Sequence, residues 1–130
     1  MDDALPKRVV EKDKFAQYTG IQLVKAEPGY ALARLEVVQE KHLNGVGFVQ
    51  GGAIFTLADF AFAAASNEAG NPTLGINATI SYIKGPRGKV LTAEAKEVSA
   101  TNRLCTYEIN VCDENGEIAA KMMATGYIKR

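Results

Sequence analysis

The sequence contains few of the residues on which metal centres and disulfides depend. It has one histidine, two cysteines and no tryptophan among its 130 residues. Cys105 and Cys112 fall on one expected strand, roughly 23 Å of extended chain apart, and their odd separation places them on opposite faces. They cannot bridge locally, and one histidine with two distant cysteines makes no zinc site. We therefore expect no metal and no cofactor.

The chain also lacks an excess of charge and a long apolar run. Fifteen basic residues balance fifteen acidic ones without forming a stripe, so nucleic acid is not an expected partner. The start, MDDALPKRVV, begins with two acids, has no apolar stretch and shows no secretory signal. The longest apolar run is interrupted by Thr56 and Asp59, which argues against a membrane span. With 47% hydrophobic residues, the sequence predicts one folded domain over residues 1–130, in the cytoplasm.

Hydrophobic periodicity predicts two helices and six strands. Strands are expected where apolar and polar residues alternate between turn signals, and Asn115-Gly116 is the strongest hairpin signal. The expected helices are Ala4–Tyr18 and Gly51–Asn67, separated in part by a loop over Gln39–Gln50. The expected strands are Ile21–Lys25, Tyr30–Val38, Leu74–Lys84, Val90–Ser99, Arg103–Cys112 and Glu117–Ile128.

This element order predicts an α+β protein with the hotdog architecture. Consecutive strands joined by short turns favour an antiparallel meander. The long apolar helix must be covered, which a curved antiparallel sheet of about five or six strands wrapped around one central helix achieves. The small core and free sheet edges favour pairing with a second copy.

Asp59 is the most informative residue, because it lies within the apolar segment GGAIFTLADFAFAAASN (residues 51–67). A helix that is hydrophobic on all sides belongs in an interior, where a carboxylate is costly and its pKa is perturbed. Its own helix face carries small or polar residues: Gly52, Thr56, Ala63 and Ser66. That seam leaves room for a ligand, so Asp59 is a candidate reactive group. A structural acid, or a half-exposed helix, is the competing interpretation.

The start of the same helix supplies a second candidate. Gly51 and Gly52 leave the first backbone N–H groups unscreened, and these groups favour negative charge on a bound oxygen. About eight residues, or roughly 12 Å, separate Gly51 from Asp59. Both can act on one substrate only if two copies of the helix contribute, which indicates a dimeric site.

The run HLNGVGFVQGGAIFTLAD at residues 42–59 resembles the signature of hotdog-fold acyl-CoA thioesterases of the phenylacetate-pathway (PaaI-like) type. The resemblance implies that Asp59 is the nucleophile or general base, and that the Gly51 N–H is the oxyanion donor. It further implies that Asn44 orients the carbonyl or the attacking water. Each site would be shared within a homodimer, and such dimers often pair into a homotetramer.

Gln50 departs from the family pattern, which commonly has histidine at this position. An amide forms hydrogen bonds but carries no proton near neutral pH. Gln50 therefore weakens activity if that histidine is catalytic, and suffices if it only positions the carbonyl. His42 is expected to be an inert loop residue.

The substrate-binding residues follow from the resemblance and from charge. Gly52 lies beside the oxyanion position, while Tyr82, Lys84 and Arg87 lie at the turn where the family seats the nucleotide end of CoA. A solvated turn is the alternative. Phe48, Phe55 and Phe62 are candidates for an acyl pocket or for the core.

The leading expectation is therefore hydrolysis of an acyl-CoA thioester to free acid and CoA. The first alternative is a non-catalytic acyl-CoA-binding or sensing hotdog module, which Gln50 keeps open. The second is a hotdog dehydratase or hydratase, which generally needs a histidine as acid–base partner of the carboxylate.

Overall fold

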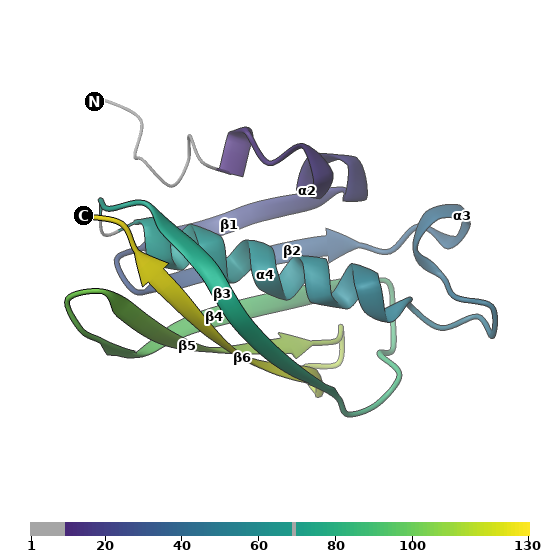
Figure 1. Ribbon diagram of the computed structural model, residues 1–130. Coiled ribbons are helices and arrows are strands. Elements are labelled where there is room, and N and C mark those ends of the chain that lie inside the picture. Colours follow the sequence, from purple (N-terminus) through teal and green to yellow (C-terminus); the bar gives the residue numbers. More distant parts are fainter. Residues whose placement is uncertain (1–9, 69) are drawn as a thin grey trace.

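The computed structural model describes residues 10–68 and 70–130. Its elements in chain order are α2 (Lys14–Thr19), β1 (Ile21–Glu27), β2 (Tyr30–Glu36), α3 (Gln39–His42), α4 (Gly51–Asn67), β3 (Thr73–Tyr82), β4 (Val90–Ala100), β5 (Leu104–Cys112) and β6 (Ile118–Ile128). Figure 1 shows α4 lying along the concave side of one curved sheet, with α2 above it. The predicted hotdog architecture is confirmed.

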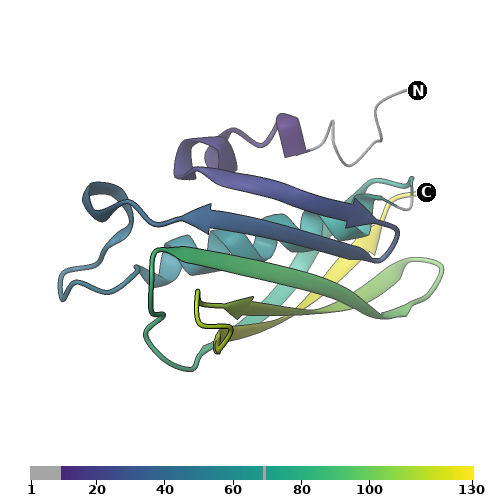
Figure 2. The same cartoon turned by 180° about the vertical axis from the view of Figure 1, so that it is seen from behind.

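The sheet is antiparallel throughout, in the order β1-β2-β4-β5-β6-β3. A meander of consecutive neighbours was wrong at one strand, because β3 pairs with β6 at the far edge while β2 pairs with β4. The long α4 carries the chain across the sheet and makes this possible. Figure 2 shows β1, β2 and β4 side by side in front of α4, seen from behind.

Small residues on two central strands let α4 approach the sheet closely. Ala31 and Ala33 on β2, with Ala93 and Ala95 on β4, are fully buried at alternate positions. Larger side chains fill the rest of the core, and those most completely buried are Leu35, Leu57, Leu91, Ile109, Val111 and Met122. The predicted alternation of β5 is confirmed, since Cys105, Tyr107, Ile109 and Val111 are all buried.

The first predicted helix, Ala4–Tyr18, is helical over most of its described part but is not continuous. The chain breaks at Asp13, whose side chain accepts a hydrogen bond from the Ala16 N–H at 3.0 Å and caps α2. Asp is a strong N-cap because its carboxylate satisfies a free N–H at the helix start. Gly20 ends α2 with φ of 96°, as expected for a left-handed C-cap. Residues 4–9 lie outside the described ranges.

The loop before α4 contains more structure than expected. Its first residues form the single turn α3, and Leu43 and Val49 pair as an isolated antiparallel bridge. Asn115-Gly116 does join β5 to β6, with Gly116 at φ of 82°. Asn115 has a negative φ. The hairpin is therefore not a two-residue type I′ turn but a longer one, with a left-handed glycine and a β-bulge.

Candidate active site

The start of α4 is capped by the residue that departs from the family pattern. The Gln50 side-chain oxygen accepts a hydrogen bond from the Gly52 N–H at 2.5 Å. No hydrogen bond to the Gly51 N–H is found in the described part of the chain. Of the first two amides of α4, one is therefore capped and the other is free to bind an oxyanion.

Gly51 is held against the end of β3. The Tyr82 hydroxyl donates to the Gly51 carbonyl oxygen at 3.1 Å. A Cβ placed on Gly51 would lie 3.1 Å from the Tyr82 ring, which is tighter than an ordinary contact. The absence of a side chain at Gly51 thus lets Tyr82 fix the backbone whose N–H is free.

Asn44 organises the tight loop that precedes α4. Its side-chain oxygen accepts from the N–H groups of Val46 and Phe48, each at 3.0 Å. The loop is closed further by a 2.7 Å bond from the Asn44 N–H to the Phe48 carbonyl. With the oxygen committed, the orientation of the amide is set, and its NH₂ remains available as a donor.

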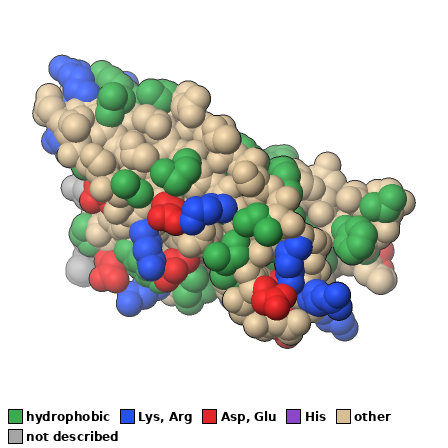
Figure 3. Space-filling view, turned by 90° about the horizontal axis from the view of Figure 1, so that it is seen from below, with side chains coloured by type: hydrophobic (Ala, Val, Ile, Leu, Met, Phe, Trp, Pro, Cys, Tyr) green, Lys and Arg blue, Asp and Glu red, His purple; other side chains and the backbone are tan. Residues whose placement is uncertain are grey.

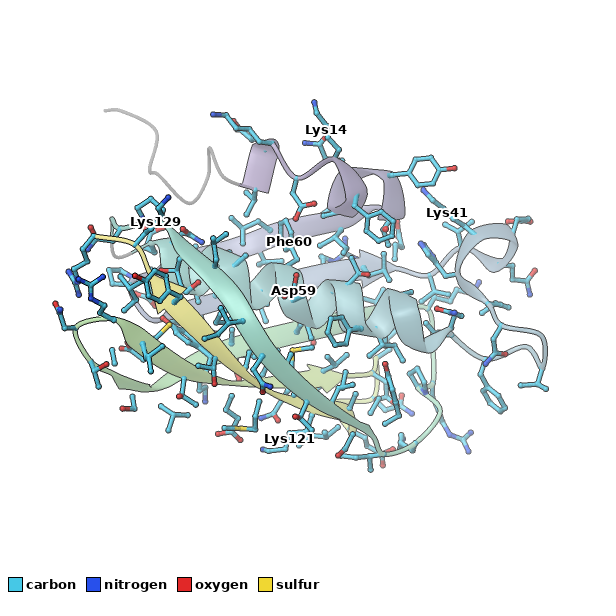
Figure 4. The ribbon with its side chains drawn as sticks, in the orientation of Figure 1. Lys14, Lys41, Asp59, Phe60, Lys121 and Lys129 are labelled. Carbon is cyan, nitrogen blue, oxygen red and sulfur yellow. The ribbon has the colours of Figure 1, made fainter. Side chains whose placement is uncertain are left out.

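Asp59 lies midway along α4, on the side that the sheet leaves open (Figure 4). The expectation that it is buried is wrong for the single chain, in which it is exposed together with Gly52. Thr56 and Ala63, also on this face, are half-buried, while Ser66 is buried. The sheet covers the opposite side of the helix, so this face stays open at Gly52 and Asp59.

The environment of Asp59 favours its protonated form. The surrounding protein withdraws water from part of the carboxylate, and this raises its pKa above the ordinary value of 3.8. The negative charge of Asp13, the cap of α2, raises the pKa further. None of the hydrogen bonds and ion pairs within residues 10–68 and 70–130 involves the Asp59 carboxylate. A raised pKa on an unpaired acid suits a proton-transfer role.

A cavity of about 590 Å³ opens beside the first turns of α4. Its walls include Gln50, Gly52 and Tyr82 from the predicted site, and Phe55 from the candidate acyl pocket. Asp59 is not among its lining residues. Asn44 and Gly51 flank the same helix end, so the structure brings these residues together and leaves Asp59 about two turns, roughly 12 Å, away.

Of the three predicted nucleotide-binding residues, Tyr82 lines the first cavity, whereas the other two lie at a second cavity, of about 830 Å³. Lys84, Arg87 and Phe48 line it. Lys84 forms ion pairs with Asp113, at 3.1 Å, and with Glu117. The hydrogen bonds that the Lys84 ammonium donates to Glu117 and Asp113 raise the pKa of Lys84 and hold its ammonium in place. The Arg87 side chain is exposed.

Phe62 and His42 have structural environments. Phe62 is buried in the core, edge-on to Tyr107 with ring centroids 5.4 Å apart. His42 is buried too, which corrects its expected place on a surface loop. Its Nδ1 accepts from the Val38 N–H at 2.9 Å and its Nε2 donates to the Thr19 carbonyl at 2.7 Å. The ring ties α2 to the loop before α4.

Sequence reasoning missed the contribution of α2 and α3 to the first cavity. Phe15 and Tyr18 of α2 and Lys41 of α3 line its outer wall. The spacing of Phe15 and Tyr18, three residues apart on a short helix, places them on one face and was the available signal. Figure 4 shows Lys41 above the N-terminal half of α4, on the side where α2 lies.

Comparison with known proteins establishes the family. Residues 46–120, more than half of the chain, match the profile of the thioesterase superfamily. The chain belongs to this superfamily, and its fold and relatives make it a PaaI-like hotdog protein. No helix in the described part is long and apolar enough to cross a membrane.

Three relatives show how far the similarity extends. A protein from Archaeoglobus fulgidus is 37% identical over 118 residues, covering 90% of this chain and 76% of the relative. The acyl-coenzyme A thioesterase PaaI from Escherichia coli K12 is 31% identical over 111 residues, covering 85% and 79%. The solved E. coli PaaI structure superposes with a TM-score of 0.91, covering 97% of this chain and 91% of that one at 25% identity. A Streptococcus mutans protein bound to acetyl-CoA gives a TM-score of 0.79 at 25% identity, covering 85% and 89%.

Proposed function

We propose that this protein hydrolyses acyl-CoA thioesters, at sites that each combine residues from two chains. The observation that carries the proposal is the division of the site. The free Gly51 N–H, the Asn44 amide and the cavity lie at one end of α4, while the unpaired Asp59 lies about two turns away. The similarity to an acyl-CoA thioesterase and to an acetyl-CoA-bound structure supports the substrate class.

The chemistry divides between the start and the middle of the helix. The Gly51 N–H and the helix dipole stabilise the negative charge that develops on the thioester oxygen. The Asn44 NH₂ donates to the same carbonyl or holds the attacking water. Asp59 of the partner chain has two possible roles. It attacks the carbonyl carbon, the C–S bond breaks with release of CoA as thiolate, and water then hydrolyses the anhydride. Alternatively, it removes a proton from a water that attacks the carbonyl carbon, and the same C–S bond breaks to give the free acid and CoA.

The capping bond of Gln50 accounts for its place in the motif. Its side-chain oxygen satisfies the Gly52 N–H, a task that needs an acceptor and no proton. A histidine nitrogen can accept the same bond. In this proposal Gln50 shapes the oxyanion site, and the missing histidine does not remove a proton-transfer group. Gly52 lets the cap approach, because a Cβ there would lie 2.6 Å from the Gln50 oxygen.

The edge strand β3 supports a homodimer. It lies at one end of the sheet, and its apolar side chains Leu74 and Ile76 are exposed, as are Tyr82 and the following Ile83. Pairing of two β3 edges would continue the sheet and cover these side chains. The small residues on the open face of α4 would let two helices lie close together, with Asp59 of each facing the cavity of the other.

The outer face of the sheet supports a pairing of dimers. It carries the Lys121–Glu108 ion pair beside the exposed Met123 of β6. Figure 3 shows hydrophobic side chains between opposite charges on this underside. A mixed surface of this kind suits contact between two dimers.

We propose that the nucleotide end of CoA binds at the second cavity. Arg87 would meet a phosphate, and Phe48 offers an aromatic face. Lys84 would contribute charge from its fixed position between Asp113 and Glu117.

Gln50 favours one second candidate, an acyl-CoA-binding module without turnover. A hydrolysis assay over aryl- and fatty-acyl-CoA substrates, with released thiol as the signal, separates the two. Thiol release that is lost in Asp59→Asn supports the enzyme. Tight binding of acyl-CoA without thiol release from any substrate supports the binding module. A dehydratase gains little support, because both nitrogens of His42 are engaged in structural bonds.

A further inference from the structure

The first cavity has an apolar inner part and a charged outer wall. Ala53, Phe55 and Leu43 line the part next to α4 and its preceding loop. Phe15 and Tyr18 continue the wall outward from α2 and are 66% and 76% exposed in the single chain. Exposed aromatic side chains that line one cavity can pack against a flat apolar ligand, which would cover them.

Most polar groups around this cavity are committed to the protein itself. The Thr19 hydroxyl donates to the Phe15 carbonyl at 2.9 Å, and the Thr56 hydroxyl donates to the Gly52 carbonyl at 2.7 Å. The His42 ring and the Tyr82 hydroxyl are engaged as described above. The inner cavity therefore offers a ligand little hydrogen bonding beyond the helix end itself.

Lys41 is the exception on the outer wall. Its ammonium lies 5.1 Å from the centre of the Tyr18 ring, a distance at which a cation is attracted to the ring face. No carboxylate oxygen of residues 10–68 or 70–130 lies within 4.0 Å of it. Among the residues that the structure describes, no acidic one lines the cavity. The cavity thus ends in one positive charge that has no counter-ion in the described chain.

We propose that this cavity selects acyl groups that end in a carboxylate. The apolar body of the acyl group would lie between Phe55 and the α2 aromatics, with its carboxylate on the Lys41 ammonium. The proposal rests on acyl-CoA being the substrate and narrows its class. The thioester carbonyl would lie at the Gly51 N–H, which places the acyl group in the cavity and the nucleotide outside it.

Binding of two non-hydrolysable thioethers tests the selection directly. S-(4-carboxybenzyl)-CoA and S-benzyl-CoA differ only in the distal carboxylate, and calorimetry gives both dissociation constants. We expect the carboxylated analogue to bind about tenfold more tightly, the effect of one partly exposed charged hydrogen bond. In Lys41→Gln this preference should disappear, and Lys41→Arg should restore most of it. Lys14→Gln, on α2 but outside the cavity wall, should keep the full preference.

The alternative anion is a phosphate of CoA. In that case Lys41→Gln would weaken both thioethers by the same factor, which overturns the proposal. Equal affinities in the unmodified protein, or no binding of either analogue, would overturn it too.

Hydrolysis of the matching thioesters, 4-carboxybenzoyl-CoA and benzoyl-CoA, reports separately on the proposed function. Hydrolysis of both at equal rates, with equal thioether binding, would retain the thioesterase and reject the selection. Selective thioether binding without any thiol release would retain the selection and reject the thioesterase.

Discussion

Asp59 and Asp113 are the same residue type in opposite environments. Asp113 is buried in the turn after β5, where its carboxylate accepts three backbone N–H bonds and faces Lys84 at 3.1 Å. The donors are Arg87 at 3.0 Å, Asn115 at 3.0 Å and Glu117 at 3.1 Å. The Arg87 N–H contributes most to holding the Asp113 pKa down at about 2. Asp59 has no such donors within residues 10–68 and 70–130, and its pKa is raised.

The difference separates a structural acid from a reactive one. Both carboxylate oxygens of Asp113 are held by hydrogen bonds, so its charge stabilises the turn and is not available to a substrate. Asp59 stands on a helix face cleared of large side chains and has no partner in the described chain. A carboxylate that is partly desolvated and unpaired costs stability, and it is retained where chemistry needs it.

The largest expected effect is on turnover. Asp59→Asn should lower kcat by roughly 10²–10⁴-fold, because the isosteric amide is neither basic nor nucleophilic. Asp113→Asn serves as the matched control and should retain kcat within about tenfold when folded, since it touches no reacting atom. Thiol release under saturating acyl-CoA measures both. Turnover near the unmodified level in folded Asp59→Asn would remove Asp59 from the mechanism.

Gln50 should have a smaller effect. Gln50→Ala leaves the Gly52 N–H uncapped and loosens the oxyanion site, at a cost in kcat of at most about 10²–10³-fold. Gln50→His should retain activity, because a ring nitrogen can accept the same bond. A folded but inactive Gln50→His protein would instead show that the amide itself contacts substrate.

The influence of Asp13 on Asp59 should be visible as a pH shift. The deprotonated acid is the active form, so kcat/KM should rise with pH through a pKa above 3.8. Asp13→Asn retains an N-cap residue but removes the neighbouring negative charge. The acid limb of the profile should then move to lower pH with an unchanged plateau. A shift toward higher pH, or no shift, would show that the charge of Asp13 does not raise the pKa of Asp59.

Asp113 should report on acid stability alone. Its pKa is lowered from 3.8 to about 2 on folding, so its stabilisation is complete above about pH 4 and is lost as pH falls toward 2. Asp113→Ala should lower Tm at pH 7 and flatten the decline of Tm between pH 4 and 2. Thermal unfolding monitored by circular dichroism measures both. An equally steep decline in the variant would assign the acid sensitivity to other groups.

The sequence predicted the helices and strands better than it predicted which strands pair in the sheet. Alternating apolar and polar residues made β4 and β5 recognisable, the Asn115-Gly116 hairpin signal placed β6, and the Gly-Gly start marked α4 to the residue. The pairing of β3 with β6 was not predictable, because β3 is exposed along most of its length and carries no pattern that names its partner. Its place at the far edge follows from α4, which carries the chain across the sheet.

The site was predicted in part, for a similar reason. A motif identifies Asn44, Gln50, Gly51 and Asp59, but hydropathy could not show that Asp59 is exposed, because alanines make every face of α4 apolar. The ion pair between Lys84 and Asp113 joins residues far apart in sequence. It could be identified only once the position of the β5–β6 turn was known. Lys41 lacked any local signal, since a lysine beside a loop is ordinarily solvated.

The central claim is that one chain supplies Asn44 and Gly51 while another supplies Asp59. Mixing Asp59→Asn with Asn44→Ala chains, each inactive alone, tests it most directly. In a mixed dimer one of the two sites has only unmodified residues, so subunit exchange should restore about a quarter of the unmodified activity per chain. Exchange demonstrated by mass spectrometry without any recovery of thiol release would contradict the shared site.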